Sequence, residues 1–546
     1  MQREVVKANI VVFIASFCTL VIELVAGRIM APYVGVSLYT WTSIIGVVLA
    51  GISIGAYLGG LIADRYPQPS TLGWLLFLSG LGAFSISPLT NLIGSAEFQT
   101  SLMVRILLIT AIIFFVPSCL LGMISPVVVK LTLNNLEKTG NVVGKIYAFS
   151  TLGSILGTFA TGFFLISWMG TRNILLTMGL ILIVAAPIFG GFFFRKKALM
   201  LFLLFLCLTL ILPVLGLYGY AAIQPGQIVL PPSPLQSLGT VYEYAFKPPS
   251  DASTYFFTES NYYTIKVKRD NRNGEDAPLE TLVLDHLIHS YNDLKDPFHL
   301  EYEYERIYEE VVRWQAGKRN SLNALFLGGG GYTLPRLIDA RYPHADIDVV
   351  EIDPEVTRVG LEYLGVSQAK HIRSFNEDAR WFIMNSKEKG KYDLVFGDAF
   401  NDLSIPYHLT TKEFALQLKS LMKPDGLLMA NVIDSFKKGL FMPAYIRTLE
   451  EVFGKGNVHL LTLGEDYDAM GISTHVVLAS PGKLDLDNFV ATLQGNGKEE
   501  MNAHVMPSDR LQQYLKERPT VVLTDDYVPV DNLIAPIFEE RFGYQK

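Results

Sequence analysis

The feature that most constrains this chain is a series of long apolar segments in its first 219 residues. We identify seven, near residues 9–31, 39–63, 71–93, 104–128, 144–168, 173–194 and 198–219. Each approaches the ~20 apolar residues that a helix needs to cross a bilayer, and a signal peptide would give only one short run. Backbone groups in lipid must bond within their own segment. The sequence therefore predicts a transmembrane helical domain over residues 1–219, with about seven spans.

Small residues recur at helical spacing inside two of these segments. Gly51, Gly55 and Gly59 share one face of the second, and Gly153 and Gly157 share one face of the fifth. Such stripes let helix backbones approach closely, as in ordinary helix packing. We expect a compact bundle in which the first and second segments meet along the Gly51–Gly55–Gly59 face.

Two charged residues lie in the first segment, Glu23 and Arg28. A charge in hydrocarbon is expensive and usually marks a site or a buried pair, although Arg28 lies near the end of the segment, where it can reach the interface. The segment "LGGLIADR" (58–65) also resembles the loop after the second helix of major facilitator transporters. These features keep a transporter or sensor function open.

The basic residues between the segments predict an orientation. With the N-terminus inside, nine lie on the inner side, namely Arg3, Lys7, Arg65, Lys130, Lys138, Lys145, Arg195, Lys196 and Lys197. The outer side has three, Arg28, Arg105 and Arg172. The positive-inside rule favours this orientation, and seven spans would then place the second half of the chain outside the cytoplasm. The chemistry predicted below favours the cytoplasm, so the side of the membrane stays open.

The charge balance reverses after residue 219. The first 219 residues carry 12 Lys or Arg and five Asp or Glu, whereas the remaining 327 carry 33 and 47. An acidic second half argues against nucleic acid as a partner, because affinity for phosphate backbones depends on Lys and Arg. It suits either a cationic substrate or an ordinary solvated surface. All three cysteines precede residue 219, which excludes a disulfide or cysteine–zinc framework in the second half.

The second half divides by composition into three parts. Residues 220–250 are rich in Pro, Gly and Ser and read as a linker. Residues 251–310 form a β-rich subdomain, in which 255–289 alternate as a hairpin or short sheet would. Residues 311–546 form an α/β nucleoside-binding domain, since strands and helices alternate from 322 onward. The expected strands are 323–328, 346–352, 392–397, 426–432, 458–463 and 474–479.

Glycines and acidic residues follow the strands of this α/β domain. Gly328–Gly331 lie between a strand and a helix, where backbone N–H groups can face a ligand. Glu351 ends the next strand, about 20 residues later, where an acidic side chain can bind ribose hydroxyls. Asp353 follows it, Asp378 comes after the third strand region, and Asp398 ends the strand at 392–397. Singly each acid suits a solvated loop or a helix N-cap, but together they predict a ligand site at the carboxyl edge of the sheet.

The glycine loop does not match the common nucleotide motifs. Tyr332 and Thr333 follow Gly331, so G-x-G-x-x-G for NAD is absent, as is the P-loop pattern. The series "ESNYYTI" (259–265), "LVLDH" (282–286), "LFLGGGG" (325–331), "VVEIDPEV" (349–356), "EDARWF" (377–382) and "YDLVFGDAF" (392–400) instead resembles the S-adenosylmethionine-dependent transferase (Rossmann-like) fold. More narrowly, it resembles the spermidine synthase family of polyamine aminopropyltransferases. With the membrane half and "LTDDYVPVDNL" (523–533), the whole is similar to bacterial fusions of a membrane domain to such a domain.

The resemblance implies a role for each matched residue. Glu351 would bind the ribose hydroxyls, Asp378 the adenine amino group, and Asp398 would deprotonate and position the attacking amine. The implied cofactor-binding residues are Gly328, Gly329, Gly330, Gly331, Glu351, Asp353, Asp378 and Ala379. The implied substrate-binding residues are Tyr262, Tyr263, Asp285, His289, Asn401 and Asp402. The donor would be decarboxylated S-adenosylmethionine or S-adenosylmethionine itself, the acceptor a polyamine, and no metal is expected.

Several positions depart from the family pattern. The aspartate of G-G-G-D-G-G, which binds the donor amine in spermidine-forming enzymes, is Gly331 here. The second aspartate of D-S-S-D-P is Asn401, the glutamine of S-x-Y-Q-x-I is Tyr263, and L-D-G-x-x-Q has His286 and His289. The family's Y-H-E motif has no secure counterpart within residues 300–310. The residues expected to bind the nucleoside therefore match the family pattern. The residues expected to bind the aminopropyl chain of the donor and the acceptor amine differ from it.

Three functions remain in competition. The first is a membrane-bound aminopropyltransferase, which alone explains the β-rich piece together with the order of motifs. The second is a membrane-bound S-adenosylmethionine-dependent methyltransferase, which the loss of an aspartate at Gly331 favours. The third is a transporter or sensor whose enzyme-like domain binds a polyamine or nucleoside without turnover. In each case we expect a multi-pass protein of a bacterial cell membrane with the lipid bilayer as partner, and we consider a homodimer.

Overall fold

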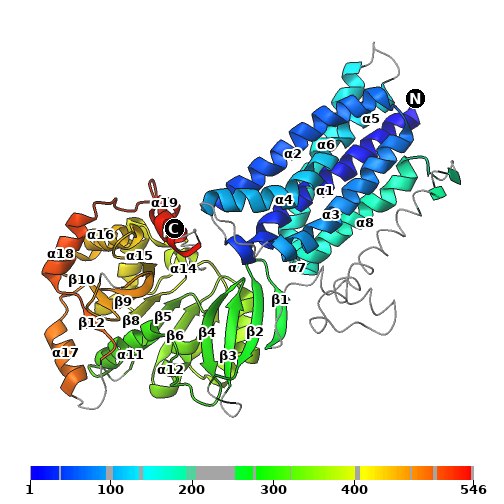
Figure 1. The fold of residues 1–546 in the computed structure, drawn as a ribbon. Helices are drawn as coiled ribbons and strands as arrows, with labels where there is room; N and C mark the ends of the chain where they lie inside the picture. Colours follow the sequence, from blue (N-terminus) through cyan, green and yellow to red (C-terminus); the bar gives the residue numbers. More distant parts are fainter. Residues whose placement is uncertain are drawn as a thin grey trace, which may run out of the picture. The chain divides into compact units, whose positions relative to one another are not determined.

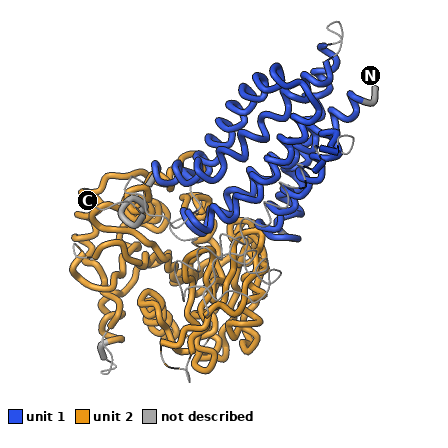
Figure 2. The backbone as a smooth tube through the Cα atoms, turned by 45° about the vertical axis from the view of Figure 1, so that its right-hand side comes forward, with its two compact units in different colours: residues 1–251 blue, residues 252–546 orange. Residues whose placement is uncertain are grey.

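A computed structural model describes residues 2–542 except 36–37, 94–101, 134–138, 193–195, 198, 201–202, 204–252, 273, 275–277, 320, 400–405, 468–469 and 496–500. The chain divides into two compact units, residues 1–251 and 252–546 (Figure 2). The predicted linker at 220–250 and almost all of the seventh apolar segment lie outside the described residues.

Unit 1 is entirely helical where it is described (Figure 1). Its helices are α1 (Gln2–Val34), α2 (Leu38–Arg65), α3 (Pro69–Ile93), α4 (Leu102–Gly122), α5 (Ile124–Thr132), α6 (Thr139–Ala160), a π-helical turn (Thr161–Leu165), α7 (Ile166–Met169) and α8 (Thr171–Phe189). Taking α4 with α5 and α6 with the π-turn, six helices are long and apolar enough to cross a membrane. They correspond to the first six predicted segments.

The glycine stripe of α2 packs on a different helix from the one predicted. A Cβ at Gly55 would lie 2.1 Å from the Cys119 carbonyl oxygen, and one at Gly59 would lie 2.6 Å from that of Met123. Both neighbours are at the junction of α4 and α5, and α2 contacts α4 far more extensively than α1. The prediction that the first and second helices meet along this face is therefore wrong. Glycine spacing identifies a close-packed face, but it does not identify the partner.

The second stripe is the one that packs on α1. A Cβ at Gly153 of α6 would lie 2.3 Å from the Phe13 carbonyl oxygen, and one at Gly157 would lie 2.7 Å from that of Phe17. Unit 1 is thus built from close helix pairs, α2 with α4, α1 with α6 and α3 with α8 (Figure 1).

Charged side chains within the helices of unit 1 differ in burial. Arg172, in the first turn of α8, is 8% exposed and donates a hydrogen bond to the Ser87 hydroxyl of α3 over 2.7 Å. Glu23 and Arg28 lie inside α1 and are half-buried. The arginine counted above as an outer-loop charge is therefore a packing element between α3 and α8.

Unit 2 is built on an eight-stranded sheet (Figure 1). Its strands are β5 (Asn323–Leu327), β6 (Asp346–Val350), β7 (Ile372–Phe375), β8 (Tyr392–Gly397), β9 (Met422–Asp434), β10 (Val458–Thr462), β11 (Ser473–Ala479) and β12 (His504–Val505). The order is β12-β10-β11-β9-β8-β5-β6-β7, in which β5 to β9 are parallel and β10 to β12 pair antiparallel. The direction of strand order reverses between β5 and β8, and ligands bind at such a point in open α/β sheets.

Helices follow the parallel strands and precede the first of them. They are α11 (Glu303–Ala316), α12 (Thr333–Arg341), α13 (Pro354–Tyr363), α14 (Ala379–Asn385), α15 (Lys412–Leu421) and α16 (Phe441–Phe453), and then α17 (Leu486–Gly495), α18 (Ser508–Glu517) and α19 (Val530–Phe542). This alternation confirms the predicted Rossmann-like α/β fold.

The β-rich segment folds as an antiparallel sheet of four strands. These are β1 (Thr254–Glu259), β2 (Thr264–Asp270), β3 (Leu279–Leu284) and β4 (Leu287–Asp293), in chain order. Ile265, Val267, Leu282 and Leu284 of this sheet pack on Val356, Val359 and Leu364 at α13. The sheet belongs to the same compact unit as the α/β fold, and its standing as a separate subdomain stays a prediction.

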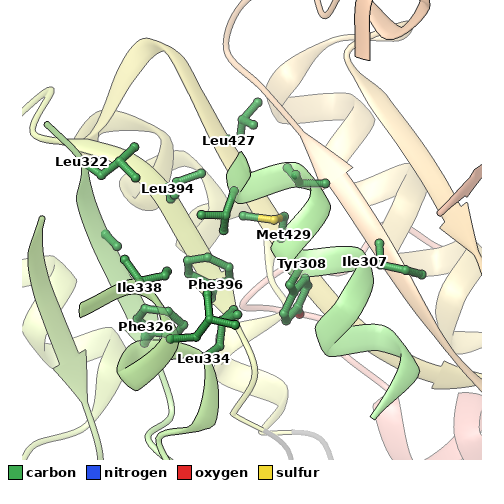
Figure 3. Close-up of a cluster of buried hydrophobic side chains, with 14 of the residues drawn as sticks. Ile307, Tyr308, Leu322, Phe326, Leu334, Ile338, Leu394, Phe396, Leu427 and Met429 are labelled. Carbon is green, nitrogen blue, oxygen red and sulfur yellow. The ribbon is translucent and has the colours of Figure 1, made fainter. Parts of the chain in front are cut away.

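The core of the α/β fold lies directly beneath the strand ends that carry the site. The rings of Phe326 (β5) and Phe396 (β8) stack with centroids 4.1 Å apart. Tyr308 and Ile307 of α11 belong to the same buried cluster (Figure 3). Each ring lies one residue before the end of its strand. The packing therefore fixes the position of the glycine loop, which follows β5, and of Asp398, which follows β8.

The packing of α2 on α4 predicts the effect of filling a glycine. Gly55→Leu should lower the melting temperature and the monodisperse fraction of the detergent-solubilised protein, because its side chain would meet backbone atoms that cannot move aside. The cost should exceed the about 1–3 kcal/mol typical of overpacking. Gly46→Leu is the matched control, because Gly46 lies on α2 with nothing within 4 Å of its Cβ position. Equal behaviour of the two variants would show that the α2–α4 contact is wrong.

Candidate active site

The glycine loop joins β5 to α12 and passes close to the end of β8. Gly328 has a φ of +100° and Gly330 a φ of +48°, which L side chains adopt with difficulty. A Cβ at Gly328 would also lie 2.4 Å from the Asp398 carbonyl oxygen. Gly328 therefore needs to be glycine for two reasons, its backbone conformation and the approach of β8.

Glu351 follows β6 and is held by backbone donors. Its carboxylate accepts hydrogen bonds from the Gly329 N–H (2.7 Å) and the Asp353 N–H (2.9 Å). The residue is 6% exposed, and burial raises the pKa of its carboxyl. These backbone bonds fix the side chain and tie the glycine loop to the end of β6.

A small cavity of about 100 Å³ gathers most of the predicted nucleoside residues. Its lining includes Gly328, Gly330, Glu351, Asp378, Ala379 and Asp398, together with Tyr263, His289 and His408. These residues come from β4 and from the segments that follow β1, β5, β6, β7 and β8. The structure therefore brings together at one point side chains up to 145 positions apart in the sequence.

Asp378 is engaged at both carboxylate oxygens. Oδ1 accepts from the Trp381 N–H (3.0 Å), which caps α14, and Oδ2 lies 2.9 Å from Nε2 of His408. The sequence prediction gave Asp378 the adenine amino group. In this arrangement His408 lies beside the same oxygen, so a base bound there would contact or displace the His408 ring.

Several predicted site residues do not line either cavity described here. Asp353 is fully buried, caps α13 through the Glu355 N–H (2.9 Å) and accepts from the Ser260 hydroxyl (2.5 Å). Asp285 accepts from the Thr264 N–H (2.9 Å) in the turn between β3 and β4. Tyr262 is 42% exposed on the surface.

His286, one of the departures from the family pattern, also lines neither cavity, and two of the predicted site residues cannot be placed. His286 follows Asp285 in the turn between β3 and β4 and is absent from both linings. Asn401 and Asp402 lie outside the described residues. The contacts given above for Asp353 and Asp285 are structural ones, made to backbone and side-chain groups of the fold itself.

Asp398, directly after β8, lines both cavities. Its Oδ2 accepts from the Tyr304 hydroxyl (3.2 Å), and its Oδ1 accepts from the Asn431 amide (2.9 Å). Burial raises the pKa of the carboxyl above its usual range, while these two hydrogen bonds lower it by less. A carboxylate with a raised pKa is a better proton acceptor than an ordinary surface aspartate.

A large cavity of about 510 Å³ adjoins the glycine loop. Its polar lining includes the carboxylates of Asp398 and Glu305, the rings of Tyr302, Tyr304 and Tyr308, and Asn431, Ser290 and His289. No lysine or arginine is among the lining residues in the described part of the chain. Such a cavity has the charge and the aromatic walls that suit an ammonium group.

Glu305 is the second carboxylate of this cavity. It is 6% exposed, and its Oε2 atom has no hydrogen-bond partner within the described residues. Burial, and then the charge of Asp398, raise the pKa of its carboxyl to about 8. A buried carboxyl of this kind is costly in the empty protein and marks a candidate functional group.

The loop position that departs from the family pattern is sterically closed. A Cβ at Gly331 would lie 1.7 Å from the Ser290 hydroxyl oxygen, and Asn292 donates to the Gly331 carbonyl over 2.6 Å. Side chains of β4 thus occupy the space that a residue 331 side chain would need. The missing aspartate at this position follows from the packing of β4 on the loop.

Sequence reasoning missed the contribution of α11 and β9, namely Tyr304, Glu305, Tyr308 and Asn431. A signal was present for two of them. Glu305, Tyr308 and Val312 share one face of α11 at helical spacing, and all three are buried. An acidic residue on the apolar face of an amphipathic helix is unusual unless it is paired or functional. Asn431 lies within a long apolar strand and could be placed only by the sheet.

The described residues offer no evident metal site. Within the described residues, no group of three or more His, Cys, Asp or Glu side chains is arranged to hold a metal ion. The polar side chains that line the two cavities are carboxylates and tyrosines together with His289, His408, Asn431 and several hydroxyl residues.

Comparisons with known proteins bear on the same region. The spermine/spermidine synthase domain family matches residues 306–461. A polyamine aminopropyltransferase of Vibrio vulnificus is 38% identical over 114 residues, which cover 21% of this chain and 38% of that protein. Polyamine aminopropyltransferase 2 of Aquifex aeolicus is 22% identical over 495 residues, 88% of each chain. A crystal structure of a probable spermidine synthase from Corynebacterium glutamicum matches 51% of this chain and 97% of its own, with 21% identity and a TM-score of 0.43.

The matched domain spans β5, β6, β7, β8 and β9, and therefore carries the glycine loop, Glu351, Asp378 and Asp398. The match to the Vibrio protein covers well under two thirds of that protein, whereas the Aquifex protein matches across both halves of this chain. Residues 306–461 therefore match the spermine/spermidine synthase domain family, and over most of its length the chain is similar to a polyamine aminopropyltransferase.

Proposed function

We propose that this protein is a membrane-bound aminopropyltransferase that uses a decarboxylated S-adenosylmethionine-like donor and an amine acceptor. The observation that carries the proposal is the large cavity, which holds two carboxylates and tyrosine rings and has no Lys or Arg in its described lining. It shares Gly328, Gly330, His289 and Asp398 with the small cavity. A donor whose nucleoside fills the small cavity would therefore extend its aminopropyl chain into the large cavity.

The small cavity suits the nucleoside of the donor. Glu351 offers carboxylate oxygens to ribose hydroxyls, and its backbone bonds to Gly329 and Asp353 keep the side chain in place. Asp378 and its partner His408 lie on the same lining, where they would contact the base. The glycine loop lets the chain pass close to the ligand.

Asp398 is the proposed proton acceptor. An ammonium ion has no lone pair, so the acceptor must lose a proton before or during attack. The free amine then attacks the carbon next to the sulfonium sulfur. A C–N bond forms, the C–S bond breaks, and its electron pair stays on sulfur, which leaves methylthioadenosine. Tyr304 and Asn431 hold the Asp398 carboxylate in one orientation, and orientation itself contributes much of the rate.

The charge of the large cavity favours a decarboxylated donor over S-adenosylmethionine. The latter carries a carboxylate on the same carbon as its amine. That carboxylate would enter a space that already contains Glu305 and Asp398, and like charges brought together at a desolvated site cost several kcal/mol. The carboxyls of the large cavity thus favour the aminopropyltransferase over the methyltransferase alternative.

The proposed donor is made in the cytoplasm, so the α/β unit should face it. With the N-terminus inside, the six described helices of spanning length return the chain to the cytoplasmic side. A further span at residues 198–219 would place unit 2 outside. The proposal therefore requires an even number of spans in a bilayer.

Removing the charge of Asp398 should separate catalysis from binding. Asp398→Asn keeps the size of the side chain and loses the proton acceptor, so single-turnover transfer should fall by about 10²–10⁴-fold. Methylthioadenosine binding should change little. Glu351→Gln should show the reverse order, with nucleoside binding weakened first. Calorimetric titration with methylthioadenosine, together with a transfer assay on an accepted amine, compares the two. Full activity in Asp398→Asn would remove the residue from the mechanism and sink the proposal.

The orientation gives a second expected outcome. A reporter that is active only in the cytoplasm, fused after Lys546, should be active, and a reporter active only outside should be silent. A fusion after Lys197, the last of the basic residues predicted to lie inside, is the matched control and should give the same answer. Opposite signals from the two fusions would reveal a span between them and would contradict a cytoplasmic catalytic unit.

A further inference from the structure

Glu305 is a buried carboxylate that the proton-transfer step does not use. Its side chain lines the large cavity in the first turn of α11, and its Oε2 atom lacks a hydrogen-bond partner among the described residues. On the same turn, Glu303 and Arg306 are exposed. The burial of Glu305 therefore reflects the face of the helix it occupies. A buried carboxylate oxygen that the described residues leave without a partner is costly unless a ligand supplies one.

The surroundings of Glu305 select a cation. The charge of Asp398 acts on it across the cavity, whereas the Thr333 side chain, the Tyr302 backbone and Arg306 lower its pKa by less than burial and Asp398 raise it. No described lysine or arginine reaches the cavity to pair with it. An ammonium group would satisfy the free oxygen and, by its charge, would favour the ionised form of Glu305 at the same time.

The position of Glu305 favours the donor over the acceptor. A donor whose nucleoside fills the small cavity passes Asp398 at the shared lining and enters the large cavity beside the glycine loop. Glu305 adjoins Thr333, which begins α12 directly after that loop. The loop offers no side chain of its own there, because Ser290 closes the space at Gly331. Glu305 and Asp398 are the two carboxylates in the described lining, and Asp398 is assigned to the acceptor.

We propose that Glu305 binds the terminal ammonium of the donor's aminoalkyl chain and thereby holds the carbon next to sulfur in line with the amine at Asp398. Glu305 is then a specificity residue that binds the ammonium end of the transferred group. The inference rests on the proposed function and deepens it, because it names the group that distinguishes the donor from its nucleoside product.

Glu305→Gln tests this assignment in the full-length, detergent-solubilised protein. The variant should bind decarboxylated S-adenosylmethionine about 10- to 100-fold more weakly than wild type, as expected for a lost charge-assisted hydrogen bond. It should bind methylthioadenosine, which has no amine, as tightly as wild type. Glu303→Gln is the matched control on the exposed side of the same turn and should bind both ligands normally. Glu305→Asp should restore part of the donor affinity, because it keeps the charge.

Other outcomes overturn the assignment in distinguishable ways. Unchanged donor affinity with a raised KM for the amine would assign Glu305 to the acceptor. Equal loss of both ligands at an unchanged melting temperature would make it part of the general architecture of the site. If wild type itself binds the donor no more tightly than methylthioadenosine, the proposed function fails before Glu305 is tested.

Discussion

The site depends on the parallel pairing of β5 with β8. Leu327 pairs in register with Gly397, and the Asp398 N–H donates to the Leu327 carbonyl over 3.1 Å. The stacked rings of Phe326 and Phe396 lie just beneath this last pair. Beyond it the two chains part, one into the glycine loop and one into Asp398. Because the strand order reverses at this pair, no neighbouring strand covers the opening, and both cavities form there.

Buried acidic residues of the α/β unit differ in the groups that balance their charge. Away from the site, buried aspartates are neutralised by cations. Asp348 is bound by Lys391 and Arg373, and Asp393 by Lys423 and Arg319. These ion pairs are structural.

At the site, buried carboxylates have hydrogen-bond donors, and no Lys or Arg lines the large cavity among the residues that the structure describes. Glu351 is held by backbone N–H groups and Asp398 by a tyrosine and an amide, whereas Glu305 keeps a free oxygen. The fold therefore gathers in one place carboxyl groups that burial makes costly to ionise, and an ammonium-bearing substrate would favour their charged forms. The remaining free energy cost in the empty protein is the usual sign of a functional site.

The sequence predicted those parts of the fold that depend on local pattern. The length of the apolar segments predicted six helices that the structure describes. Apolar runs such as 323–328 and 392–397 predicted the strands of the α/β unit. The Gly–Glu351–Asp378–Asp398 series was predicted to meet because parallel strands end at one edge. What failed depends on long-range packing. The partner of the Gly55 face was wrong because spacing carries no information about the opposing helix. Asp353 caps α13, and its role in binding the cofactor stays a prediction. Glu305 lies in α11, between the motifs at 282–286 and 325–331, and belongs to neither.

The central claim is that the large cavity selects a donor without a carboxylate, and the most direct measurement is a comparison of two sulfonium compounds. Calorimetric titration of the wild-type protein with decarboxylated S-adenosylmethionine and with S-adenosylmethionine measures that selection without requiring the acceptor to be known. The account predicts that the decarboxylated compound binds at least about tenfold more tightly, because the carboxylate of the other would face Glu305 and Asp398. Equal binding, or tighter binding of S-adenosylmethionine, would contradict it.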